Sequence, residues 1–291
     1  MKGPFIASAS ERLAVVATLS TFEDLVKAIG GDHVKVASIA SPKFDPHFIE
    51  PKPSDVLKVK RAKVFAHAGL DLELWRGPLL DAAGNREMFP GAPGELDLSQ
   101  GVSLLEIPTR PLSRAAGDIH LYGNPHYWQQ PDNVRTMAQA IAGKLSAVDP
   151  AHQDAYRANM REFIQRLDRK IAEWRAKLEP YRGRELVGYH REFSYLMAFA
   201  GLRMSEFLEP KPGIPPTPQH LQFIERYIAE RKISAILQSS YFPRQAARAV
   251  AKRTGAKVGI LCQNVRELPA CSDYTAMMDY NVSQLVGVLH N

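Results

Sequence analysis

Residues 151–178 read AHQDAYRANMREFIQRLDRKIAEWRAKL and contain neither glycine nor proline. Large apolar side chains recur here at steps of three or four residues, the period of one buried helix face. They are Tyr156, Met160, Phe163, Leu167, Ile171, Trp174 and Leu178. About 28 residues at ~1.5 Å each give a helix of about 42 Å, which ends before Pro180. This length exceeds what a crossover helix needs, so we expect a rigid connector between two lobes; the alternative is a long surface helix.

Short apolar runs alternate with amphipathic stretches before this helix. The runs are rich in Val, Ile and Leu, which is typical of buried parallel strands. They are Leu13–Ala17, Val34–Ile39, Val64–His67 and Val102–Ile107. Helices are predicted at Ser20–Gly30 and Pro53–Ala62. In the first of these helices, Ser20 and Glu23 have the spacing of a capping box.

The same alternation resumes after the long helix. Strands are predicted at Leu186–Tyr189, Ile233–Leu237 and Val258–Leu261, and helices at Phe193–Ala200, Thr217–Glu230, Pro243–Thr254 and Asp273–Leu289. Such alternation is typical of α/β domains. We therefore expect an α/β protein of two lobes, each with a mostly parallel sheet flanked by helices, joined by one long rigid backbone helix. The expected limits are 11–148 for the N-terminal lobe, 149–180 for the connecting helix and 181–291 for the C-terminal lobe.

Composition excludes several classes of protein. The chain has 291 residues, of which 45% are hydrophobic and 23% charged, so disordered, coiled-coil and collagen-like architectures are ruled out. No window has the roughly 18 consecutive apolar residues that a membrane span needs. The net charge of +6 is not gathered into a basic run, so we expect no nucleic-acid partner. Two cysteines are too few for a disulfide framework.

Three of the nine histidines stand in short, stiff contexts. His47 and His126 each follow a proline, and His190 closes a predicted strand, where open α/β sheets place ligand-binding groups. Three neutral imidazoles suit Zn²⁺, which binds nitrogen at about 2.0–2.1 Å. Any one of these histidines alone would more simply be a hydrogen-bonded core or surface residue. The sequence lacks a phosphate loop, a nucleophile elbow and a dinucleotide fingerprint, so the commonest α/β activities lose support.

From about Leu13 to Leu289 the chain resembles the metal-binding family of ABC-transporter substrate-binding proteins, the periplasmic zinc and manganese receptors. The resemblance rests on several motifs along the chain. They are Asp45-Pro-His47 with Pro51 to Asp55, Ala68 to Trp75, Gly123 to Trp128, Tyr189 to Tyr195, Ala247 to Val258, and Tyr274 with Asn281. It implies that His47, His126 and His190 are metal ligands in a cleft between two lobes.

The fourth ligand is where this sequence departs from the family pattern. That family often has an aspartate after the last strand of the second lobe, but this chain has Cys262-Gln263-Asn264. Water, a Cys262 thiolate, and an outlying carboxylate such as Glu209 or Asp273 all remain open. We favour a disulfide between Cys262 and Cys271 over a Cys262 ligand, because an oxidising compartment would allow it.

Other residues are assigned supporting or structural roles. His120 is what remains of a histidine-rich loop, and we expect it to order that loop rather than to bind metal. His67 is a candidate to support a metal ligand through a hydrogen bond, with Asp45, Glu50 and Glu192 as alternatives. Trp75 and Trp128 are expected to pack the lobes, and four histidines to lie at the surface: His33, His152, His220 and His290.

The resemblance implies a periplasmic receptor that binds a divalent transition metal and delivers it to an ABC permease. Three histidines favour Zn²⁺, with Mn²⁺ less suited because it prefers oxygen ligands. We expect a monomer and a signal peptide that is missing from the chain as given. A zinc-dependent lyase or hydrolase using metal-bound water is the alternative. A receptor for a chelated metal ranks last, because it leaves the three histidines unexplained.

Overall fold

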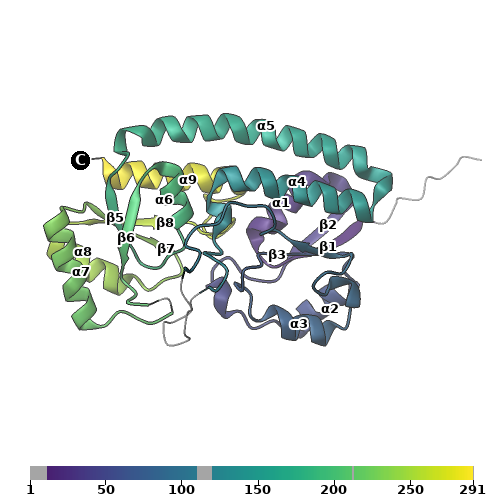
Figure 1. Cartoon of the computed structure of the whole chain (residues 1–291), viewed down its shortest axis with the longest axis horizontal. Coiled ribbons are helices and arrows are strands. Elements are labelled where there is room, and N and C mark those ends of the chain that lie inside the picture. The colour runs from purple at the N-terminus through teal and green to yellow at the C-terminus, as the bar shows by residue number, and fades with distance from the viewer. Residues whose placement is uncertain (1–11, 110–119, 212, 291) are drawn as a thin grey trace, which may run out of the picture.

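One long helix, α5, lies along both halves of the molecule in the computed structural model (Figure 1). α5 spans Gln153–Leu178 and lies between 3₁₀ turns at Pro150–His152 and Glu179–Tyr181. Six of the seven residues of the predicted stripe are buried, all except Met160. Asn159 donates a hydrogen bond to the Ile29 carbonyl of α1, and Trp174 donates one to Asp279 of α9. The predicted connector is therefore confirmed, since one end of α5 packs on the first half and the other on the second.

The structure describes residues 12–109, 120–211 and 213–290. The first ten residues and the expected outer limits of the lobes at residues 11 and 291 lie outside these ranges. The internal limits at residues 148 and 180 stay predictions. None of the helices in the described part of the chain combines the length and apolarity that crossing a membrane requires.

The first sheet has four parallel strands in the order β2-β1-β3-β4. Its strands are β1 (Leu13–Ala17), β2 (Val34–Ser38), β3 (Val64–His67) and β4 (Glu95–Asp97). The helices of this half are α1 (Ser20–Gly30), α2 (Pro53–Arg61), α3 (Arg76–Ala83) and α4 (Pro131–Val148). Three strands and two helices match the predicted segments, whereas β4, α3 and α4 were not predicted.

The second sheet repeats this order as β6-β5-β7-β8, again with parallel pairing. Its strands are β5 (Glu185–Gly188), β6 (Arg203–Phe207), β7 (Ala235–Ser239) and β8 (Lys257–Leu261). The helices are α6 (Ser194–Ala200), α7 (Pro218–Arg231), α8 (Arg244–Thr254) and α9 (Tyr274–Leu289). Of these elements only β6 was not predicted. In each sheet the strand order reverses at one point, where open α/β sheets bind ligands beyond the carboxyl ends of the strands.

The segment Val102–Ile107 is not a strand, so that prediction was wrong. Its backbone groups bond to side chains of other elements instead of to a neighbouring strand. Asn133 accepts from Ser103 N and donates to Ser103 O, and the Tyr195 hydroxyl accepts from Leu105 N. Glu106 then has a φ of 53°, in the left-handed region that a strand cannot accommodate. Apolar composition alone could not distinguish this extended bridge between the halves from a strand.

Ser20 and Glu23 do not form the predicted capping box. The residue that caps α1 is Leu19, which makes no side-chain cap. The Ser20 hydroxyl donates to the Val265 carbonyl at 2.7 Å, and Glu23 accepts from Lys27 and Ser38 and pairs with Arg266. Both side chains therefore serve long-range contacts that sequence spacing does not reveal.

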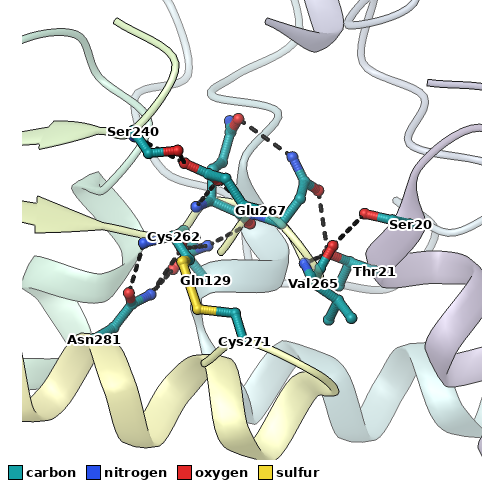
Figure 2. Close-up of a disulfide and its surroundings, with 11 residues drawn as sticks. Ser20, Thr21, Gln129, Ser240, Cys262, Val265, Glu267, Cys271 and Asn281 are labelled. Atoms are coloured by element: carbon teal, nitrogen blue, oxygen red, sulfur yellow. Dashed lines mark hydrogen bonds between the residues drawn. A yellow bond between two sulfur atoms is a disulfide. The ribbon is translucent and has the colours of Figure 1, made fainter. Parts of the chain in front are cut away.

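Residues beyond β1 and β8 hold the two halves together, as Figure 2 shows. Besides the Ser20 contact, Thr21 Oγ1 accepts from Val265 N at 3.0 Å and donates to Asn264 at 3.1 Å. Gln129, which ends a 3₁₀ turn just before α4, donates to the Gln263 carbonyl at 2.7 Å. All of these side chains are buried, so the carboxyl ends of the two sheets meet in a dry, polar contact.

Trp128 fills the apolar part of this contact. It is fully buried, stands edge-on to Phe22 at 5.4 Å between ring centroids, and donates from Nε1 to the Gln263 carbonyl at 2.8 Å. The Tyr274 hydroxyl in turn donates to the Trp128 carbonyl. Trp128 thus packs the two halves against each other, as predicted.

Replacing Trp128 should therefore destabilise the whole chain. We expect Trp128→Ala to lower the free energy of unfolding by about 3–5 kcal/mol, because the change opens a cavity and removes one of the two hydrogen bonds to the Gln263 carbonyl. Phe44→Ala is the matched control: Phe44 is 64% exposed, and its loss should cost about 0.5 kcal/mol or less. Urea denaturation followed by circular dichroism measures both. Equal stability of the two variants would contradict this account.

Candidate metal centre

Three predicted ligands, His47, His126 and His190, come together although more than sixty residues separate each from the next. Each offers one ring nitrogen, and these three atoms lie within 4.8 Å of one another. The ring centroids are 5.3 Å apart for His47 and His126, 5.6 Å for His47 and His190, and 5.7 Å for His126 and His190. Among the described residues, these three form the only group of histidine, cysteine and carboxylate side chains with this geometry.

His47 and His126 are held by the same kind of hydrogen-bonded turn. Each is the third residue of an Asx-Pro-His turn, Asp45-Pro-His47 and Asn124-Pro-His126. In the first turn Asp45 Oδ1 accepts from both the backbone N (3.0 Å) and Nδ1 (2.6 Å) of His47. In the second, Asn124 Oδ1 accepts from the same two atoms of His126, at 3.0 and 2.9 Å. The turn fixes both the backbone and the tautomer of the histidine, and leaves Nε2 as the ligand atom.

His190 follows β5 and is held by the neighbouring strand. Its Nδ1 donates to Glu209 Oε2 at 2.8 Å, and Glu209 comes shortly after the end of β6, which pairs with β5. Gly188 ends β5 in a crowded position, since a Cβ there would lie 2.9 Å from the His190 carbonyl oxygen and 2.7 Å from the Met204 sulfur. Glycine is therefore required for the chain to bring His190 to this point.

The unpaired ligand atoms show that the site fits a metal ion. Nε2 of His126 and Nε2 of His190 are buried without a hydrogen-bond partner among the described residues. A buried polar atom without a partner is costly, and such atoms in native structures often mark an ion or water site. Three imidazole nitrogens with their other nitrogen on an acceptor are the usual protein ligands of Zn²⁺.

Burial and neighbouring imidazoles control the protonation of the site. Burial, helped by the nearby His47, His190 and His120, holds the pKa of His126 well below its usual range. Burial alone would raise the pKa of Asp45, but its hydrogen bonds and ion pair with His47 lower it overall. The site therefore combines a neutral imidazole, that of His126, with the Asp45 carboxylate, which stays ionised behind His47.

The structure decides several of the open fourth-ligand alternatives. Cys262 and Cys271 form a disulfide (Figure 2), so the Cys262 thiolate is not available as a ligand and the favoured pairing is found. Glu209 is used to orient His190, and Asp273 caps α9 by accepting from Ala276 N. Neither carboxylate belongs to the group of converging ligand atoms in the described part of the chain.

Of the residues expected to support a ligand, Asp45 has that role and His67 does not. His67 pairs with Glu95 of β4 at 2.9 Å and with Arg76 of α3, so its contacts lie within the first half of the molecule. Glu192 is fully buried and accepts from Ser239 N, while burial and then the nearby Glu209 and Asp45 charges raise its pKa to about 8.

Sequence reasoning missed Asn124 and Glu209 as supporting residues. The repeated Asx-Pro-His spacing was a signal that could have identified Asn124. Glu209 could not be found in this way, because its role depends on the pairing of β5 with an unpredicted strand. Trp75 was expected to pack the lobes; its indole donates to the Pro46 carbonyl at 2.9 Å, a contact within the first half that steadies the His47 turn.

Known proteins resemble this chain over most of its length. A family model described as "ZnuA: Zinc-uptake complex component A periplasmic" matches residues 15–288. The iron-binding protein YfeA of Yersinia pestis is 29% identical over 256 residues, which cover 86% of this chain and 76% of that protein. The manganese ABC transporter substrate-binding lipoprotein PsaA of Streptococcus mitis is 26% identical over 96% of this chain and 90% of its own length.

Solved structures share the fold. A crystal structure of ZnuA superposes with a TM-score of 0.81 at 23% identity, covering 96% of this chain and 99% of that one. The substrate-binding protein FpvC of Pseudomonas aeruginosa, in complex with Mn²⁺, gives a TM-score of 0.82 at 22% identity, with coverage of 96% and 99%. At these identities the likeness establishes the two-lobed α/β architecture.

In the metal-free protein, His126 should remain neutral at pH 6.5, where an ordinary histidine is half-protonated. Its folded-state pKa lies below the unfolded value, so the folded state binds fewer protons there and loses stability as the pH falls below about 6.5. Nuclear magnetic resonance of the ring nitrogens should show the proton on Nδ1 and none on Nε2. A titration midpoint at or above 6.5 for His126 would contradict the assignment.

Proposed function

The chain belongs to the family of the periplasmic zinc-uptake complex component A, whose members are metal-binding transport receptors and not enzymes, and on this premise we propose its cargo and its partner. We propose that it binds a divalent transition metal, most readily Zn²⁺, through His47, His126 and His190, and delivers it in the periplasm to the permease of an ABC transporter. We further propose that it acts as a monomer. The alternative of a zinc lyase or hydrolase is set aside because the family is one of receptors.

The observation that carries this proposal is the convergence of three preoriented imidazoles. Each histidine has an acceptor on Nδ1, namely Asp45, Asn124 and Glu209, at 2.6–2.9 Å. Because the rings are already oriented, binding a metal costs little rearrangement. Preorganisation of this kind supports tight binding.

The ligand set supports zinc over manganese. Imidazole suits Zn²⁺, Cu²⁺, Fe²⁺ and Ni²⁺, whereas Mn²⁺ is better matched by carboxylate, carbonyl and water oxygens. Relatives include an iron-binding protein and a manganese-transporter protein, so family membership alone leaves the metal open. The three nitrogens in this chain are the reason to prefer zinc.

The contact between the lobes bears on how the metal is released. The ends of the two sheets are joined by buried hydrogen bonds, and α5 packs on both halves. A wide hinge opening would break these contacts. We therefore propose that release depends on local movement of a histidine-bearing turn, with little change in the angle between the lobes.

Metal titration tests the cargo. Wild-type protein should bind Zn²⁺ with a Kd below 1 µM and Mn²⁺ more weakly, as expected for nitrogen ligands. His126→Ala and His190→Ala should each weaken zinc binding by ~100-fold or more, which exceeds the loss expected for a residue that only supports a ligand. His152→Ala is the control, because this histidine pairs with Asp149 outside the site. Micromolar or weaker wild-type binding, or full binding after His126→Ala, would refute the proposal.

Delivery is tested in cells. A strain lacking the gene should grow poorly when zinc is chelated from the medium, and the wild-type gene should restore growth where the His126→Ala gene does not. Equal restoration by the two genes would show that metal capture at this site does not serve uptake.

A further inference from the structure

A fourth histidine, His120, reaches the three that carry the proposed function. Its Nε2 lies 3.1 Å from Nε2 of His47, and the two ring centroids are 5.1 Å apart. The centroid of His126 is 6.2 Å away. We propose that His120 is the fourth metal ligand, so that the metal is held by four imidazole nitrogens. This inference rests on the proposed function, because it concerns the same metal.

The separation of the two Nε2 atoms fits shared coordination. Two ligands at about 2.0–2.1 Å from a tetrahedral Zn²⁺ lie roughly 3.3–3.4 Å from each other. In the structure, Nδ1 of each ring faces a carboxylate, which places the ring proton on Nδ1 and a lone pair on Nε2. The observed separation of 3.1 Å between the two Nε2 atoms is close to that value. A modest inward movement of His120 would complete the tetrahedron with His126 and His190.

His120 has the same kind of support as the other three histidines. Its Nδ1 donates to Asp71 Oδ1 at 2.8 Å, and the other oxygen of Asp71 accepts from Leu121 N at 3.1 Å. The carboxylate thus holds both the ring and the adjacent backbone, as Asp45 does for His47.

The chain before Asp71 adopts a conformation that is unusual for its residues. Gly69, Leu70 and Asp71 have φ values of 68°, 50° and 57°, in the left-handed region that leucine rarely enters. Such strain persists where the surrounding structure requires it and often accompanies a functional site. Here its effect is to direct the Asp71 side chain to His120.

Among the described residues, His67 and His220 lack an acceptor on Nδ1 of this kind. His67 has Arg76 within hydrogen-bond distance of both ring nitrogens. His220 turns Nε2 to the Phe207 carbonyl at 2.8 Å, which makes that nitrogen a donor and unable to bind a metal. An acceptor on Nδ1 is shared by His47, His126, His190 and His120, and Nε2 of His120 approaches Nε2 of His47.

The expectation that His120 only orders its loop is replaced by this proposal. Water, the remaining alternative for the fourth position, becomes one outcome of the test. An all-nitrogen site would strengthen the preference for Zn²⁺ over Mn²⁺, because no oxygen ligand would remain.

X-ray absorption at the zinc edge counts the imidazoles directly. Zinc-loaded wild-type protein should show four imidazole ligands, and His120→Ala should show three with one oxygen. Competition with a chromophoric chelator should show zinc affinity lowered at least ~10-fold by His120→Ala and by His120→Gln. His152→Ala should change neither result.

Asp71 has a test of its own. Asp71→Ala should lower zinc affinity, and Asp71→Asn should largely restore it, because the amide oxygen still accepts from Nδ1 of His120. A purely structural role for Asp71 would leave the imidazole count of both variants at four.

The outcomes separate the two proposals. Wild-type protein that binds zinc through three imidazoles and an oxygen, with unchanged affinity after His120→Ala, overturns this inference and leaves the proposed function intact. Wild-type protein that does not bind zinc, or binds it equally well after His126→Ala, overturns both.

Discussion

The hydrogen bond on Nδ1 of each clustered histidine is the constraint on which the site depends. It selects the tautomer, fixes the plane of the ring and directs Nε2 to a common centre. At His47 and His126 the acceptor comes from the residue two positions earlier, so each short turn is largely its own scaffold. At His190 the acceptor is Glu209, so the orientation of this ring depends on the pairing of two strands. Local and long-range structure thus serve the same requirement.

The fold supplies the relative placement that these turns cannot. His190 follows β5 of the second sheet, whereas the turn that carries His126 is bonded to the second half through Asn124. The Asn124 side chain donates to the Arg191 carbonyl at 3.0 Å, and the Tyr195 hydroxyl donates to the Asn124 carbonyl at 2.8 Å. Buried contacts at Ser20, Thr21 and Gln129 hold the ends of the two sheets together, and α5 spans both halves. Histidines from distant parts of the sequence are therefore fixed relative to one another by the fold.

The sequence predicts most of this molecule where the signal is periodic or local. The α5 stripe, most strands and the three histidines could be identified because burial period and stiff turns are encoded in neighbouring residues. Prediction from the sequence fails where a residue forms hydrogen bonds with residues far away in the chain. Val102–Ile107 looks like a strand but bonds to Asn133 and Tyr195, and Ser20 looks like a cap but bonds to Val265. The partner of His67 and the approach of His120 to His47 likewise depend on tertiary structure alone.

The central claim is that these preoriented imidazoles hold one metal ion between the lobes. Anomalous diffraction recorded at the zinc edge from crystals of the zinc-loaded protein tests it most directly. The account predicts one strong peak within bonding distance of Nε2 of His47, His126 and His190, with the lobes placed as in the metal-free chain. A principal peak elsewhere on the molecule, or a metal bound through Nδ1 with the Asp45, Asn124 and Glu209 contacts broken, would contradict it.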